Sequence, residues 1–108
     1  MTPAVALDRA VGALTGLAIG DALGMPSQEM PRPEVLRRFG PQGLAGFEPA
    51  ADDHPLAAGL PAGSVTDDTE QTLLLARMLL AGAGHLDTAG YARALLAFRP
   101  RRSRRSTG

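Results

Sequence analysis

The sequence predicts an all-α fold with one long loop that is rich in Pro and Gly. Helix-capping and helix-breaking residues delimit four segments of helical length. No stretch shows the alternation of apolar and polar residues that is typical of a half-buried strand. Between the second and third segments, residues 41–62 follow neither period. We therefore expect helices packed on helices around one core.

The length and the charges limit what this fold can do. With 108 residues the chain has room for one small domain with a modest core. Eleven acidic residues balance eleven Arg, and five of these Arg fall within residues 99–108. There is no Lys and no Cys, so disulfides, thiol nucleophiles and thiolate zinc sites are excluded. We interpret residues 1–98 as the domain and residues 99–108 as an Arg-rich disordered tail.

Three interpretations of the tail stay open. It is an arm for nucleic acid or an acidic partner, a solvated tail without a role, or the translated remnant of a truncated or frameshifted gene. We favour the last, and we expect no nucleic-acid partner because the body in front of the tail is acidic. The apolar run at residues 10–20 is shorter than the roughly 20 residues of a spanning helix, and no basic signal-peptide region precedes it. We expect a cytoplasmic protein without a membrane contact.

The first helix is expected from Pro3 to about Leu23. Thr2 suits the N-cap and Pro3 suits the first helical position. Within this helix glycine recurs every fourth residue, at Gly12, Gly16, Gly20 and Gly24. Since a helical Gly costs about 1 kcal/mol relative to Ala, we expect this row to allow the close approach of another backbone.

A second, short helix is expected over residues 33–39, with Pro33 at its first position and Gly40 at its end. The long loop follows and contains three adjacent polar residues, Asp52, Asp53 and His54. Their side chains have the chemistry of metal ligands, but Asp is also typical of polar turns. We favour the turn.

The third helix, expected over residues 68–83, is apolar nearly all round, which predicts burial on every side. Asp87 is expected to cap a last helix that reaches about residue 98. One face of that helix carries Tyr91, Leu95 and Phe98. His85 lies in the connecting turn, and we assign it no role.

The densest polar cluster is Thr66-Asp67-Asp68-Thr69-Glu70, at the start of the third helix. In one interpretation Asp67 is the N-cap and Glu70 completes a capping box. In the other, adjacent carboxylates and hydroxyls are hard oxygen ligands for Mg²⁺ or Mn²⁺. Spacing alone favours the cap, but a cap needs one side chain and leaves the second acid unexplained.

Two runs in this order resemble a known family. They are residues 8–26, which end in Gly20-Asp21-Ala22-Leu23-Gly24-Met25-Pro26, and residues 61–69, which end in Thr66-Asp67-Asp68-Thr69. Together they resemble the N-terminal part of the ADP-ribosylglycohydrolase family, over about residues 8–98. The resemblance implies an orthogonal all-helical bundle with a two-metal site that hydrolyses the N- or O-glycosidic bond between ADP-ribose and an acceptor. Its partner would be an ADP-ribosylated protein or a small ADP-ribosyl compound.

The resemblance also assigns ligands. Thr66, Asp67 and Asp68 would supply one side of a site for Mg²⁺ or Mn²⁺. The family's remaining ligands come from a C-terminal motif that this chain lacks, so we expect a truncated chain that is inactive alone. The alternative is a non-catalytic, small helical interaction module or a vestigial one. Because three other helices cannot cover the third helix fully, we also expect the chain to be prone to self-association.

One departure from the family concerns Gln28. Family members that hydrolyse tend to carry Glu seven residues after the motif aspartate, here Asp21, and Gln cannot act as an acid or base. Glu29, one residue further, is our candidate catalytic group if the loop shifts by one residue. The alternative is that both are surface loop residues.

Overall fold

The computed structural model describes residues 1–98, which form α-helices joined by loops. The elements are α1 (Pro3–Gly24), the 3-10 turn η1 (Met25–Ser27), α2 (Arg32–Phe39), α3 (Asp67–Ala81) and α4 (Thr88–Ala97). None of residues 1–98 lies in a strand, so the all-α prediction is confirmed. The predicted disordered tail, residues 99–108, lies outside the described residues.

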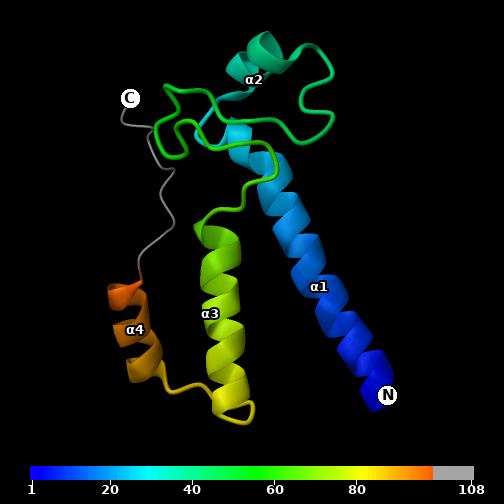
Figure 1. Cartoon of the computed structure of the whole chain (residues 1–108), viewed down its shortest axis with the longest axis vertical. Coiled ribbons are helices and arrows are strands. Elements are labelled where there is room, and N and C mark those ends of the chain that lie inside the picture. Colours follow the sequence, from blue (N-terminus) through cyan, green and yellow to red (C-terminus); the bar gives the residue numbers. More distant parts are fainter. Residues whose placement is uncertain (99–108) are drawn as a thin grey trace.

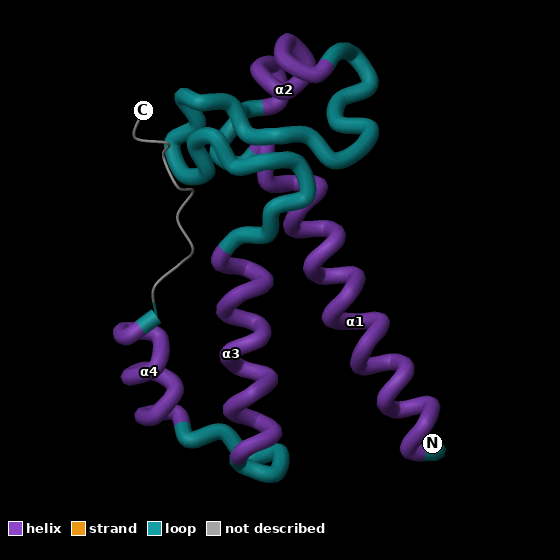
Figure 2. Tube along the Cα trace, in the orientation of Figure 1, coloured by secondary structure: helices purple, strands orange, loops and turns teal. Residues whose placement is uncertain are grey.

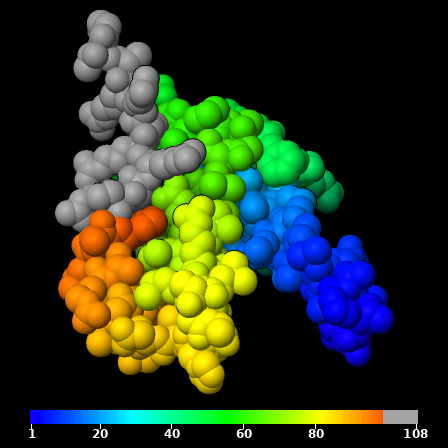
Figure 3. Space-filling view, turned by 60° about the horizontal axis from the view of Figure 1, so that its bottom comes forward, coloured from blue at the N-terminus to red at the C-terminus, as the bar shows by residue number. Residues whose placement is uncertain are grey.

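The helices meet at one end of the molecule and separate toward the other. In Figure 1, α1 and α3 converge beneath the long loop and then diverge, and α4 lies beside α3. Figure 2 shows that the loop between α2 and α3 covers the end where α1 and α3 meet. In the space-filling view of Figure 3, the N-terminal half of α1 stands clear of the rest of the described chain.

The first helix begins as the sequence predicts. The hydroxyl oxygen of Thr2 accepts a hydrogen bond from the backbone N–H of Val5 at 3.2 Å, and Pro3 occupies the first turn. The helix ends at Gly24, one residue beyond the predicted end. Met25 keeps a right-handed helical backbone, and the chain then tightens into the η1 turn.

The glycine row of α1 does not pack against another backbone. Apart from the chain neighbours and the adjacent backbone of α1 itself, no atom of the described chain lies within 4 Å of a Cβ built on any of the four glycines, Gly12, Gly16, Gly20 and Gly24. The prediction of close backbone contact is therefore wrong for residues 1–98. The reason is the divergence of the helices, because α3 meets α1 only near the C-terminal end of α1.

One helical segment passes a length-and-composition test for crossing a membrane. Residues Pro3–Ser27 have a window with a mean hydropathy of 1.2, and none of that window is buried within the described chain. Core helices of soluble proteins and N-terminal signal sequences pass the same test. The expected absence of a membrane contact thus stays a prediction.

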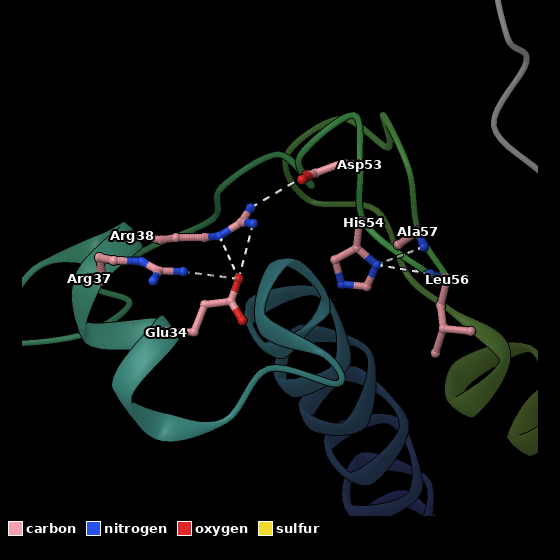
Figure 4. A network of polar contacts seen from close by, with 7 residues as sticks. All are labelled: Glu34, Arg37, Arg38, Asp53, His54, Leu56 and Ala57. Carbon is pink, nitrogen blue, oxygen red and sulfur yellow. Dashed lines mark hydrogen bonds and ion pairs between the residues drawn. The ribbon is translucent and has the colours of Figure 1, made fainter.

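A short helix precedes the long loop and is tied to it. α2 begins at Arg32, one residue before the predicted start, and ends at Phe39, with Gly40 as its C-cap at a φ of 91°. Glu34 accepts a hydrogen bond from Arg38 at 3.0 Å, and the same guanidinium lies 3.5 Å from the carboxylate of Asp53 (Figure 4). This network connects α2 with the loop.

The long loop lacks helix and strand, as predicted, but it carries most of the small core. The buried side chains of Met25, Ala50 and Ala57 pack together, and Leu60 packs against them. A hydrogen bond of 2.9 Å from the N–H of Ala50 to the carbonyl of Leu60 closes the loop on itself. The loop therefore folds over the end of α1 as a compact unit.

The third helix is far less buried than its composition predicts. Thr69 is its one buried residue within the described structure, while Leu73 is 37% exposed and Leu80 is 83% exposed. The prediction of burial on every side is wrong, since among the described helices α1 and the short α4 make the main contacts with α3. The expected exposure of apolar helix surface is confirmed.

The last helix begins after Asp87, at the predicted N-cap. The side chain of Asp87 makes no capping hydrogen bond and instead lies 3.8 Å from the guanidinium of Arg93. Its predicted apolar face is half-buried and consists of Tyr91, Leu95 and Phe98.

Candidate functional site

The carboxylate of Asp21, on α1, joins the two motifs of the sequence. It accepts hydrogen bonds from the N–H of Thr66 at 2.7 Å and from the hydroxyl of Thr66 at 2.6 Å. It also accepts hydrogen bonds from the N–H of Thr69 at 3.3 Å and from the hydroxyl of Thr69 at 2.6 Å. These contacts fix the start of α3 against the end of α1.

The same contacts keep Asp21 ionised. Burial alone would raise the pKa of Asp21, but the hydrogen bonds from the side chains and backbone amides of Thr66 and Thr69 outweigh it. The net effect is a pKa below the ordinary value of an aspartate, because donors that point at a carboxylate favour its charged form. The junction thus depends on a negative charge.

The N-cap of α3 is Thr66 rather than Asp67. The hydroxyl oxygen of Thr66 accepts a hydrogen bond from the N–H of Asp68 at 3.5 Å, and Asp67 is already the first helical residue. A capping box would give the N–H of the cap residue to Glu70, but here the N–H of Thr66 goes to Asp21. The predicted cap at Asp67 is therefore wrong.

This cap leaves two carboxylates available at the helix start. Asp67 and Asp68 are exposed, and neither side chain has a hydrogen bond or ion pair to any of residues 1–98. The positive end of the helix dipole favours acidic groups at these positions. Both carboxylates can therefore accept a cation without losing a protein partner.

Two hollows flank the start of α3, and each borders one of these carboxylates. The Asp68 hollow, of about 360 Å³, is lined by Gly16, Leu17, Gly20, Asp21, Gly24, Gln28 and Asp68. The Asp67 hollow, of about 230 Å³, is lined by Gln28, Leu56, Ala57, Leu60, Val65, Thr66, Asp67 and Glu70. Three glycines of the row in α1 thus face an open space beside the acidic cluster.

The side chain of Gln28 borders both hollows, whereas Glu29 borders neither. Glu29 is exposed and has a φ of 62°, an uncommon backbone conformation for a residue with a side chain. The structure places Gln28 beside the acidic cluster, and a catalytic role for Glu29 stays a prediction.

The donor atoms fit one side of a metal site. No group of three or more His, Cys, Asp or Glu side chains that could hold a metal ion gathers within residues 1–98. Thr66, Asp67 and Asp68 nevertheless place one hydroxyl and two carboxylates at a single helix start. Mg²⁺ and Mn²⁺ prefer such oxygen ligands, but an octahedral shell needs more of them.

The second candidate group, in the long loop, is a polar turn as predicted. Nδ1 of His54 accepts hydrogen bonds from the N–H of Leu56 at 3.1 Å and the N–H of Ala57 at 2.9 Å (Figure 4). Asp53 faces Arg38. These side chains do not form a metal-binding group within the described chain.

The sequence model of the ADP-ribosylglycohydrolase family matches residues 2–108. This chain belongs to the ADP-ribosylglycohydrolase family. The match extends further at both ends than residues 8–98, over which the two motifs predicted the resemblance. No solved structure matches the chain significantly.

Three curated relatives are each about 40% identical to this chain. The uncharacterized protein YegU of Escherichia coli strain K12 is 40% identical over 80 residues, which are 74% of this chain and 23% of the relative. The ADP-ribosyl-[dinitrogen reductase] glycohydrolase of Rhodospirillum rubrum is 39% identical over 87 residues, 76% of this chain and 25% of the relative. The ADP-ribosylarginine hydrolase Tri1 of Pseudomonas putida strain GB-1 is 42% identical over 96 residues, 89% of this chain and 22% of the relative. The chain thus spans about a quarter of the length of these relatives.

Sequence reasoning missed the role of Asp21. Its signal was an acid that directly follows the apolar run at residues 10–20, beside the glycine row and within the first family motif. A partly buried carboxylate in such a place needs donors, because removing a charge from water without partners is costly. The donors lie 45 and 48 residues further along the chain.

Proposed function

We propose that this chain carries the N-terminal side of the metal site of an ADP-ribosyl hydrolase. The observation that supports this most strongly is the junction at Asp21, which joins the two family motifs and leaves the side chains of Asp67 and Asp68 without a hydrogen bond or ion pair to any of residues 1–98. Family membership supports the reaction class.

In this proposal the residues divide into ligands and a positioning group. Thr66, Asp67 and Asp68 would hold Mg²⁺ or Mn²⁺. Asp21 orients Thr66 by accepting a hydrogen bond from its hydroxyl group. The hydroxyl oxygen accepts one hydrogen bond from the N–H of Asp68, which leaves one lone pair for a cation. A divalent cation, when bound, would supply a Lewis acid and an activated water for glycosidic hydrolysis.

The proposed substrate is an ADP-ribosylated protein or a small ADP-ribosyl compound. Two relatives are named for hydrolases of ADP-ribosylated dinitrogen reductase and of ADP-ribosylarginine, which supports a glycosidic bond between ADP-ribose and an acceptor. Glu29 would be the acid or base if the loop that carries it moves toward the acidic cluster.

We propose further that the 108-residue chain alone does not hydrolyse ADP-ribosyl bonds. Residues 1–98 offer ligands for one side of a metal site, and catalysis needs the reacting groups fixed from all sides. The alternative function is a non-catalytic helical interaction module or a vestigial one. The exposed leucines of α3, Leu73 at 37% and Leu80 at 83%, favour it, since exposed apolar surface is typical of contact with another chain.

Calorimetric titration with Mn²⁺ tests the metal assignment. The parent chain is expected to bind Mn²⁺ weakly, and the double variant Asp67→Asn with Asp68→Asn should lose this binding, because an amide is a poorer ligand for a hard cation. Helix content, measured by circular dichroism, should stay nearly unchanged, since both side chains are exposed.

A matched control is available in the long loop. The double variant Asp52→Asn with Asp53→Asn removes the same charge from another adjacent pair and should bind Mn²⁺ like the parent chain. Equal binding by the Asp67 and Asp68 double variant would show that the cluster only starts a helix.

A further inference from the structure

Residues 50–60 of the long loop fold around one imidazole. The two ends of this segment are tied by a hydrogen bond of 2.9 Å from the N–H of Ala50 to the carbonyl of Leu60. Between the ends lies His54, which is 4% exposed and whose own N–H donates to the carbonyl of Ala51 at 3.0 Å. We call this segment the His54 loop.

The side chain of His54 holds the loop closed through one ring nitrogen. Nδ1 accepts hydrogen bonds from the N–H of Leu56 at 3.1 Å and from the N–H of Ala57 at 2.9 Å (Figure 4). A nitrogen that accepts carries no proton, so the ring in the closed loop is a neutral imidazole with its proton on Nε2. Nε2 has no hydrogen-bond partner within residues 1–98. The polar contacts of this ring therefore all depend on the lone pair of Nδ1.

The residues that His54 holds cover both the small core and the Asp67 hollow. Ala57 is 4% exposed and packs with the fully buried Met25, and Leu60 packs against this cluster. Leu56, Ala57 and Leu60 also line the Asp67 hollow. The two hydrogen bonds to Nδ1 thus fix a flap that covers Met25 and forms one wall of the hollow.

No charged group contacts the ring where it lies in the closed loop. Ionisable side chains on the segments around it are Asp52 and Asp53 in the loop, Glu34 and Arg38 on α2, and Asp67 and Glu70 on α3. None of them makes a hydrogen bond or ion pair with the imidazole within the described chain. Arg38 instead pairs with Glu34 at 3.0 Å and with Asp53 at 3.5 Å. A protonated His54 in this place would be a buried cation without a counter-ion, which is unfavourable.

We infer that the His54 loop is an acid-sensitive flap, in which uptake of a proton at Nδ1 releases Leu56 and Ala57 and opens the loop over Met25 and the Asp67 hollow. An imidazolium carries a proton on each nitrogen and has no lone pair, so both backbone hydrogen bonds are lost at once. Histidine changes its charge between about pH 5 and pH 8. The loop is therefore closed at the upper end of this range and open at the lower end. This device needs neither a metal nor turnover, so it stands apart from the proposed function.

NMR of the isotope-labelled 108-residue chain tests the inference. At about pH 8, Nδ1 of His54 should resonate as an unprotonated nitrogen and Nε2 as a protonated one. Hydrogen exchange is then measured at about pH 8 and about pH 5. The protection factors of the Leu56 and Ala57 amides, which correct for intrinsic exchange, should fall at least about tenfold in acid, because two hydrogen bonds are lost.

The junction between α1 and α3 supplies an internal control. The N–H groups of Thr66 and Thr69 donate to the carboxylate of Asp21. The pKa of Asp21 lies below the ordinary value of an aspartate, so this carboxylate stays ionised at about pH 5. Both threonine amides should keep their protection there. Equal loss of protection at the junction and in the loop would mean that acid unfolds the whole chain, and it would overturn the inference.

Variants separate the charge of His54 from its shape. His54→Asn keeps an acceptor near the position of Nδ1 but takes up no proton, so the Leu56 and Ala57 amides should be equally protected at both pH values. His54→Leu offers no acceptor and should leave them unprotected at both. His85→Asn removes the other histidine of the chain and should keep the pH dependence of the parent.

Oxidation by hydrogen peroxide reports whether the flap uncovers the core. Met25 is fully buried, whereas Met1 is 80% exposed and serves as the reference. Peptide mass spectrometry should show several-fold more Met25 sulfoxide at about pH 5 than at about pH 8, with little change at Met1.

The inference is overturned by any of three results. They are a protonated Nδ1 in the parent chain at about pH 8, unchanged protection of the two loop amides at about pH 5, and an acid effect of parental size in His54→Asn. The parent chain and His54→Asn decide the matter if His54→Leu does not fold.

Discussion

The two ends of the pair formed by α1 and α3 differ, because contacts hold the helices together at one end only. Where α1 and α3 meet, the four hydrogen bonds to Asp21 and the buried side chain of Met25 fix the helices beneath the long loop. At the opposite end, Val11 of α1 is 54% exposed and Leu80 of α3 is 83% exposed, and the helices diverge (Figure 1).

This difference shows at which end the side chains of α1 and α3 have partners among residues 1–98. At the junction, Thr66 and Thr69 donate hydrogen bonds to Asp21 and Met25 is packed, so the start of α3 has a defined position within residues 1–98. At the divergent end, the helices carry apolar residues that the described chain does not cover. The site region is therefore the more stable part, and local opening should begin at the divergent end.

The largest effect should come from core truncation at the junction. Met25→Ala should lower the free energy of unfolding by about 2 to 4 kcal/mol, because Met25 is fully buried and its loss leaves a cavity. Leu80→Ala, the matched change at the divergent end, should shift it by less than about 0.5 kcal/mol. Chemical denaturation followed by circular dichroism measures both.

Equal costs for these two truncations would break the comparison. That result would mean that Leu80 is covered in solution, and a concentration-dependent midpoint of the transition would identify a second copy of the chain as the cover.

A smaller effect should follow from the charge of Asp21. Its pKa is lowered in the folded state, so the carboxylate stabilises the fold at pH values above the ordinary aspartate pKa. This contribution is lost as the pH falls through the lowered pKa, where the folded protein also takes up the proton. Asp21→Asn should remove about 1.5 to 3 kcal/mol near neutral pH, the range for hydrogen bonds to charged groups.

Denaturation at a series of pH values from neutral to acidic measures this dependence. The difference in stability between the parent chain and Asp21→Asn should shrink with acid, while Asp8→Asn, on the exposed part of α1, should follow the parent chain. A difference that stays constant with pH would show that the shape of the side chain matters and its charge does not.

The sequence predicted local features well. Thr2 and Pro3 at the start of α1, Gly40 at the end of α2 and the absence of regular structure in residues 41–62 depend on neighbouring residues only. The all-α fold class followed from the same signals. Family membership followed from two short motifs, which identify relatives without any knowledge of packing.

The contacts between distant residues could not be read in the same way. The N-cap of α3 is Thr66 and not the predicted Asp67. The N–H and the hydroxyl of Thr66 donate hydrogen bonds to Asp21, which is far away in the sequence. The prediction that α3 is buried on every side failed for a related reason. An apolar composition shows that a helix needs cover, but it does not show which chain supplies the cover.

The smallest expected effect concerns the glycine row and has the opposite sign from our expectation based on the sequence. Apart from the chain neighbours and the adjacent backbone of α1 itself, a Cβ at Gly12 meets no atom of the described chain within 4 Å, and Ala is favoured over Gly in a helix by about 1 kcal/mol. Gly12→Ala should therefore raise the free energy of unfolding by about 0.5 to 1 kcal/mol. Gly40→Ala is the control, because a φ of 91° strains any residue with a side chain and should lower stability.

Destabilisation by Gly12→Ala would restore the original interpretation of the row. It would mean that another backbone approaches α1 in solution, since nothing within residues 1–98 is close enough to clash with the new methyl group. Sedimentation of the parent chain and of Gly12→Ala would then separate two sources of that backbone. A loss of dimers in the variant assigns the contact to a second copy of the chain, whereas unchanged monomers assign it to residues beyond 98.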